Sequence, residues 1–202
     1  MMECIFSLDY EMYGNGEGSL RELVYEPAEK IRAIFKKWNA SCVIFVEAAE
    51  LEILRLTGTD PAIDLVEQQI REFYKEGFEI GLHIHPQWYN ARNQSGIWLM
   101  DYSEYNLATL SAERIRTIIM RAIQYIRKVI EDPTFVPISF RAGNWLFQPT
   151  EIIASVLAEY GVRIDSSVYK GGVQRQHRLD YRRALKNGYY WSFTEDVNVP
   201  DT

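Results

Sequence analysis

The stretch EIGLHIHPQW (79–88) joins a short apolar run to two of the three histidines in the chain, His83 and His85, and then meets a proline. Side chains at positions i and i+2 of a strand point to the same face, so a strand over 78–85 would aim both imidazoles at one place. Two neutral nitrogen ligands on one rigid element suit a divalent metal such as zinc. The alternative is one histidine hydrogen-bonded in the core beside another that faces solvent.

Apolar, strand-like runs alternate with helical patterns on both sides of this stretch. Strands are expected at 3–9, 41–47, 78–85, 136–143 and 162–168, and helices at 26–39, 60–77, 111–132 and 149–161. Asp60 and Ser111 are the expected N-caps of two of these helices. The alternation predicts an α/β fold with a parallel sheet or barrel, in which sites lie at the carboxyl ends of the strands.

Composition and charge limit the classes of function. The chain has 202 residues, 47% of them hydrophobic, and a net charge of −6, which suits one globular domain over 1–202. Lys and Arg form no basic stripe, so nucleic acid is not an expected partner. No apolar run is long enough for a membrane span, and no secretory signal is visible. Cys4 and Cys42 lie in strand-like runs and are predicted to be buried free thiols in a reducing cytoplasm, with a disulfide as the alternative.

Polar residues of particular types fall at the expected strand ends. They are Asp9, Glu11, Glu47, His83, His85, Arg141, Asp165 and Ser166. Asp9 and Glu11 again stand at i and i+2, so one carboxylate could bind a metal while the other takes a proton from water. The alternative is a loop-opening Asp followed by a solvated Glu. A guanidinium at Arg141 could pin a carboxylate through paired hydrogen bonds, or it could form an ordinary surface ion pair.

The order of these motifs resembles the polysaccharide deacetylase family, the NodB-homology domain of carbohydrate esterase family 4. The resemblance rests on FSLDYEM (6–12), GFEIGLHIHPQW (77–88), SFRAGNW (139–145) and RIDSSV (163–168), and it extends over nearly the whole chain. It implies a distorted (β/α) barrel with parallel strands and outer helices. It also implies metal-dependent removal of an N-acetyl group from an amino sugar or glycan.

The resemblance also implies roles for individual residues. Asp9 takes the place of the family's base, and Arg141 would hold it ionised and oriented. Tyr10 stands where the family has a carboxylate ligand, so Asp9 and Glu11 both remain candidates to join His83 and His85 on a divalent metal, expected to be zinc. The histidines are two residues apart here and four apart in the usual motif, which indicates a divergent branch.

The resemblance says less about the residues that contact the substrate and about the general acid. Candidates for contact with the sugar are Trp88, Asn144, Trp145 and Asp165. The family's last strand and its late histidine motif, which supplies a general acid, are not visible. His177 is the remaining histidine and therefore a candidate for that acid. Two other functions stay open: a degenerate domain that binds glycan without cleaving it, and a metal-dependent amidohydrolase acting on another C–N bond.

Overall fold

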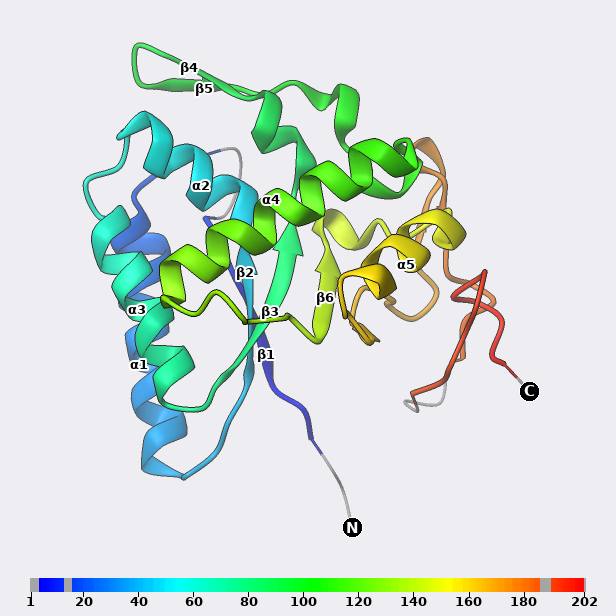
Figure 1. Cartoon of the computed structure of the whole chain (residues 1–202), viewed down its shortest axis with the longest axis horizontal. Helices are drawn as coiled ribbons and strands as arrows, with labels where there is room; N and C mark the ends of the chain where they lie inside the picture. The colour runs from blue at the N-terminus through cyan, green and yellow to red at the C-terminus, as the bar shows by residue number, and fades with distance from the viewer. Residues whose placement is uncertain (1–3, 13–15, 186–189, 202) are drawn as a thin grey trace.

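The computed structural model describes residues 4–12, 16–185 and 190–201, and is built around a five-stranded parallel sheet (Figure 1). In sheet order its strands are β1 (Ser7–Tyr10), β2 (Val43–Glu47), β3 (Glu79–Ile84), β6 (Ser139–Ala142) and β7 (Ile164–Asp165). Every neighbouring pair is parallel, which confirms the expected parallel sheet. Among the described residues no strand joins β1 to β7, so the sheet is not closed there.

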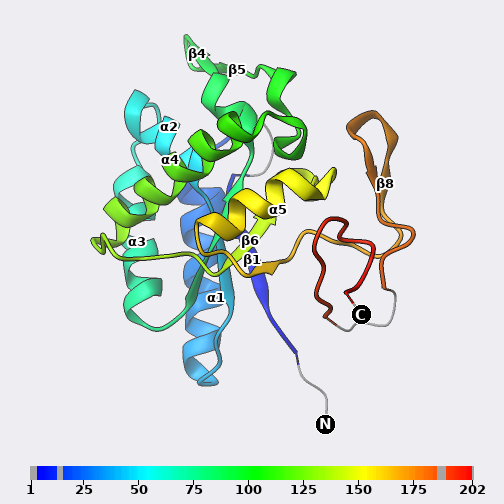
Figure 2. The same ribbon diagram turned by 45° about the vertical axis from the view of Figure 1, so that its right-hand side comes forward.

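Five α-helices pack around the sheet in the described part of the chain, one more than the alternating pattern predicts. They are α1 (Glu26–Lys37), α2 (Ala48–Thr57), α3 (Ile63–Lys75), α4 (Ala112–Ile130) and α5 (Thr150–Glu159). Helix α4 crosses in front of the strands in Figure 1, while the C-terminal part of the chain lies on the side of the sheet away from α1 and α3 (Figures 1 and 2). No helix in the described part of the chain has both the length and the apolar character that a membrane crossing requires.

Smaller elements connect this framework. A π-helical turn (Arg21–Tyr25) precedes α1, and 3₁₀ turns cover Pro86–Asn90, Tyr102–Glu104, Leu107–Thr109, Gly143–Trp145 and Arg175–His177. Two antiparallel hairpins pair β4 (Arg92–Gln94) with β5 (Ile97–Leu99) and β8 (Val173–Gln174) with β9 (Leu179–Asp180). Neither hairpin was expected from the sequence.

The strand register separates an apolar face of the sheet from a polar one. Tyr10, Val46, Leu82 and Phe140 lie side by side in one row and are fully buried. This row faces the helices, since the Tyr10 ring packs edge to face against Phe73 of α3. Because side chains alternate along a strand, the neighbouring positions face the other way. These positions are Asp9, Phe45, Glu47, His83 and Arg141.

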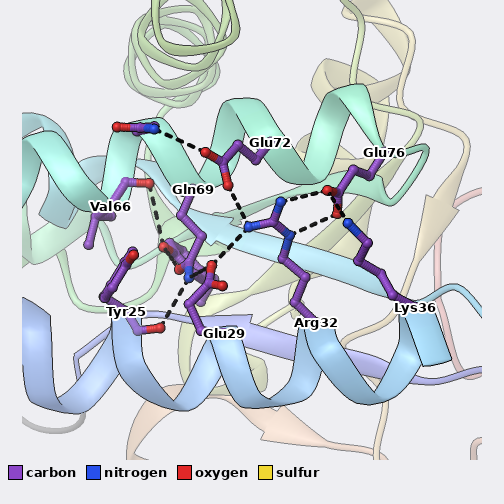
Figure 3. Close-up of polar contacts among 10 residues, drawn as sticks. Tyr25, Glu29, Arg32, Lys36, Val66, Gln69, Glu72 and Glu76 are labelled. Carbon is purple, nitrogen blue, oxygen red and sulfur yellow. Dashed lines mark hydrogen bonds and ion pairs between the residues drawn. The ribbon is translucent and has the colours of Figure 1, made fainter.

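Polar contacts link α1 to α3, and α3 to the end of β1. Arg32 of α1 forms ion pairs with Glu72 and Glu76 of α3 (Figure 3). Nearby, the hydroxyl of Tyr10 donates a hydrogen bond to Oε1 of Gln69 at 2.5 Å. The last residue of β1 is thus tied to α3, which fixes the point at which the chain leaves the sheet toward Glu11.

At single residues, some of the expectations from the sequence are confirmed and others are wrong. Ser111 caps α4 as expected, by accepting a hydrogen bond from the Arg114 amide, but Asp60 does not cap α3. That helix begins at Ile63 with Ala62 at its N-cap position, while Asp60 accepts hydrogen bonds from the amides of Leu20 and Ala62. Cys42 is buried, whereas Cys4 is exposed and so contradicts the expectation for that thiol.

Candidate metal centre

Four side chains gather at the carboxyl ends of three neighbouring strands. Glu11 follows β1, Glu47 ends β2, His83 lies in β3, and His85 follows β3 directly. Each offers one donor atom, and the four atoms all lie within 4.8 Å of one another. The sequence predicted that both histidines would meet Asp9, Glu11 or both, and the structure brings Glu11 to them but not Asp9. The sequence placed Glu47 at a strand end but did not assign it to the metal.

The orientation of His83 is set by a backbone carbonyl. Its Nδ1–H donates a hydrogen bond to the carbonyl oxygen of Arg141, the residue beside it on β6, at 2.7 Å. With Nδ1 protonated, the neutral ring carries its free lone pair on Nε2. Nε2 lies 3.4 Å from Oε2 of Glu11. His83 therefore presents an electron-pair donor to the centre of the group, as a metal ligand must.

His85 faces both carboxylates. Its Nδ1 lies 2.8 Å from Oε2 of Glu47 and 3.2 Å from Oε2 of Glu11. Burial alone would lower the pKa of His85, but the carboxylates of Glu11 and Glu47 outweigh it and raise that pKa well above its ordinary value. A Cβ atom at Gly143 would lie 2.7 Å from the His85 ring, so the absence of a side chain there lets the ring occupy this position.

The two glutamates are held by different means. Oε1 of Glu47 accepts hydrogen bonds from the amides of Ala49 and Glu50, which makes Glu47 the N-cap of α2 and leaves Oε2 free to face His85. Burial works against the charge of Glu11, but the nearby imidazoles of His83 and His85 outweigh it and lower the pKa of Glu11 well below its ordinary range. Glu11 therefore stays a carboxylate at neutral pH.

The donor set fits a divalent cation. Carboxylate oxygens and imidazole nitrogens are the ligands that zinc, iron, manganese and related ions accept in proteins. Oε2 of Glu11, Oε2 of Glu47 and Nε2 of His83 are all electron-pair donors turned toward one another, and a cation between them would satisfy all three. The group lies at the carboxyl ends of parallel strands, where sites in α/β folds are found.

Asp9 lies outside this group and binds Arg141 instead. The guanidinium donates from Nη1 to Oδ1 of Asp9 at 2.5 Å, from Nη2 to the hydroxyls of Ser7 and Ser166, and from Nε to the Ser166 carbonyl. It also lies 4.2 Å above the centre of the Phe45 ring. These contacts fix the guanidinium on the polar face of the sheet and differ from those of an ordinary surface ion pair.

The aromatic candidates for sugar contact differ in exposure. Trp145 is 47% exposed, and its ring centre lies 5.4 Å from that of Tyr169. Trp88 is only 3% exposed, because its ring packs edge to face against Trp98 of the β4–β5 hairpin. Asn144 has a positive φ of 55°, and its buried Nδ2 has no hydrogen-bond partner in the structure. Of the two tryptophans, only Trp145 offers an open ring face in this structure.

Asp165 and His177 occupy separate surroundings. Asp165 accepts hydrogen bonds from the amide and the hydroxyl of Ser167, and burial raises its pKa to about 7. The ring of His177 packs against Tyr105 with 4.6 Å between ring centres, and its carbonyl accepts a hydrogen bond from Asn106. His177 is not a member of the four-residue group.

No protein-family model matches the chain, and no curated protein matches it. Solved structures similar to it include a CE4 family pseudoenzyme from Bacillus anthracis, at 14% identity and a TM-score of 0.48, covering 80% of this chain and 41% of that one. A peptidoglycan N-acetylglucosamine deacetylase, solved with a bound benzamide compound, is 15% identical with a TM-score of 0.49, covering 80% of this chain and 54% of that one.

A family 4 acetyl xylan esterase from Clostridium thermocellum, solved with a cobalt ion, is 18% identical with a TM-score of 0.40. The match covers 81% of this chain and 73% of the esterase. The chain spans about half the length of the pseudoenzyme and the deacetylase. These structures belong to the family whose motif order the sequence resembles, but at such identities and TM-scores the likeness carries no conclusion about activity.

Proposed function

We propose that this chain is a metal-dependent hydrolase that removes an N-acetyl group from an amino sugar or glycan. The proposal rests on four side chains whose donor atoms lie within 4.8 Å of one another: Glu11, Glu47, His83 and His85. The ion pair of Asp9 with Arg141 lies on the same polar face of the sheet. A cation site beside an oriented carboxylate is the combination that metal-assisted hydrolysis requires. The motif order of the sequence supports N-acetyl groups as the target.

Each residue then has a distinct task. A divalent ion held by the four-residue group would polarise the acetyl carbonyl and lower the pKa of water. Asp9 takes the proton from the attacking water. Arg141 orients Asp9 through their ion pair at 2.5 Å, and its other hydrogen bonds keep the guanidinium from turning away.

The sugar is expected to lie on the side of Trp145. The exposed Trp145 ring, with Tyr169 beside it, offers an apolar face of the kind on which sugar rings stack. Trp88 is buried and does not offer such a face, because its ring packs against Trp98.

One observation favours a second candidate, a domain that binds glycan without cleaving it. The chain has three histidines, and the third, His177, packs against Tyr105 rather than joining the four-residue group. The leaving amine would then need its proton from another group. Asp9 could return to it the proton taken from the attacking water. A fold of this kind does not decide between cleavage and binding.

Acetate release from a panel of N-acetylated sugars, measured on protein of known metal content, tests the proposal. The hydrolase releases acetate in proportion to bound metal, and Asp9→Asn stops the release. Glycan binding with no acetate release by the metal-loaded protein would support the binding domain instead.

A further inference from the structure

We propose that Glu47 is itself a metal ligand, so that two carboxylates and two imidazoles form a site made for a six-coordinate divalent ion such as Mn²⁺ or Fe²⁺. This inference rests on the metal site of the proposed function. It replaces the expectation of zinc held by three protein ligands, and it gives a role to a residue that the sequence motifs do not single out.

The first argument is that the two carboxylate oxygens of Glu47 have different contacts. Oε1 is occupied by the amides of Ala49 and Glu50 at 3.0 and 3.2 Å. Oε2 has one contact of its own, Nδ1 of His85 at 2.8 Å. A helix cap would need only one oxygen, and Ser, Thr, Asp or Asn would supply it more commonly. The longer side chain carries its second oxygen to the histidines.

The second argument is charge. The Glu47 side chain is 1% exposed, and among the described residues its ion-pair partner is His85, not a lysine or arginine. Removing a carboxylate from water is costly unless an opposite charge compensates it. The N-terminus of α2 supplies part of that compensation. A divalent cation at Oε2 would balance Glu47 and Glu11 together, which a single positive charge on His85 cannot do.

The third argument is the number of donors. Four protein ligands complete the coordination of a tetrahedral ion, as in structural zinc sites, and leave no position for water or substrate. On a six-coordinate ion the same four leave two positions open. Mixed carboxylate and imidazole donors suit manganese and iron. The Glu11 side chain is 27% exposed, against 3% for His83, so the group is open to solvent on the Glu11 side.

Glu47→Gln separates the two roles of the residue. The amide oxygen can still cap α2, while an NH₂ group, which cannot bind a metal, replaces the oxygen beside His85. Binding of Mn²⁺ and Zn²⁺ to metal-free protein is measured by calorimetry, and the coordination number is taken from the visible spectrum of the Co²⁺ form. Glu113→Gln, an exposed glutamate in the first turn of α4, is the matched control.

We expect the wild-type protein to bind one Mn²⁺ and its Co²⁺ form to show the weak visible bands of six-coordination. Glu47→Gln should lose at least about tenfold in Mn²⁺ affinity, the low end even for residues that only support a ligand. The control should bind as wild type does. If Glu47→Gln does not fold, Glu47→Asp keeps a capping carboxylate but is too short to reach His85, and the same loss is expected.

Two results would overturn the inference and leave the proposed function standing. One is unchanged Mn²⁺ affinity in a folded Glu47 variant. The other is a Co²⁺ spectrum of the wild-type protein with intense tetrahedral bands. If the wild-type protein bound none of these ions, the inference and the proposed metal-dependent function would both fall.

Discussion

The carbonyl oxygen of Arg141 accepts a hydrogen bond from Nδ1 of His83 at 2.7 Å, so one residue orients both halves of the site. Its backbone sets which nitrogen of His83 faces the cation position, and its guanidinium holds Asp9. The register of β3 and β6 places His83 and Arg141 opposite each other, which makes this double contact a consequence of strand pairing. The candidate metal ligands and the proposed base are therefore positioned by the same rigid sheet.

His83→Ala and His85→Ala should each lose most of the metal affinity, because each removes one imidazole donor from the group. Loss of a ligand should exceed the roughly tenfold to hundredfold cost of losing a supporting residue. Calorimetry with a divalent ion measures the change. His177→Ala is the matched control, since His177 packs against Tyr105, and it should bind metal as wild type does. Full metal occupancy in either of the first two variants would remove that histidine from the site.

Asp9→Asn should abolish turnover while metal stays bound. The asparagine keeps an oxygen for Arg141 but cannot accept a proton at neutral pH, so we expect a fall of roughly a hundredfold or more. Acetate release and metal content are measured on the same preparation. Loss of the metal together with activity would show that Asp9 is a ligand, and activity near wild type would remove Asp9 from the mechanism.

Arg141→Lys should lower turnover more than metal affinity. A single ammonium cannot reproduce hydrogen bonds from Nε, Nη1 and Nη2 to three different residues. The contact with Phe45 would also weaken, at a cost of about 1 kcal/mol in the free energy of unfolding. Acetate release and urea denaturation separate the two effects. An unchanged rate would mean that Asp9 needs no such partner.

The sequence predicted the parallel α/β architecture and a metal group of both histidines with Asp9, Glu11 or both, because these follow from alternation along strands and from the place of strand ends. It missed α2, because that helix starts at Ala48 with no loop after β2 and Glu47 serves as its cap. The apolar run simply continues from strand into helix. The position of Glu47 at a strand end is the signal that could have placed it in the four-residue group.

Other features depend on contacts between distant parts of the chain, which spacing cannot reveal. Trp88 looked like a sugar-facing ring, but Trp98 of an unanticipated hairpin covers it. The ion pair of Asp9 with Arg141 joins residues 132 positions apart, and it was expected from the family resemblance and not from spacing. In the sequence, Asp9 and Glu11 were equal candidates for the metal, and the structure places Glu11 in the four-residue group and Asp9 beside Arg141.

Asp165→Asn should make the protein's stability depend less on pH. Burial raises the pKa of Asp165 to about 7 in the folded protein, against about 4 in an unfolded chain. Between those values the folded protein keeps a proton that the unfolded chain releases. The free energy of unfolding therefore falls as pH rises from about 4 to about 7, by at most about 1.4 kcal/mol per pH unit. Urea denaturation across this range should show a shallower fall in the variant, and an identical slope would contradict this account of Asp165.

The most direct test of the metal centre is an anomalous-diffraction map from a crystal soaked in Mn²⁺. We predict one strong peak about 2.0 to 2.3 Å from Oε2 of Glu11, Oε2 of Glu47, Nε2 of His83 and Nδ1 of His85, with Asp9 still bound to Arg141. A map with no peak among these four atoms, or with the ion on Asp9 instead, would contradict the account.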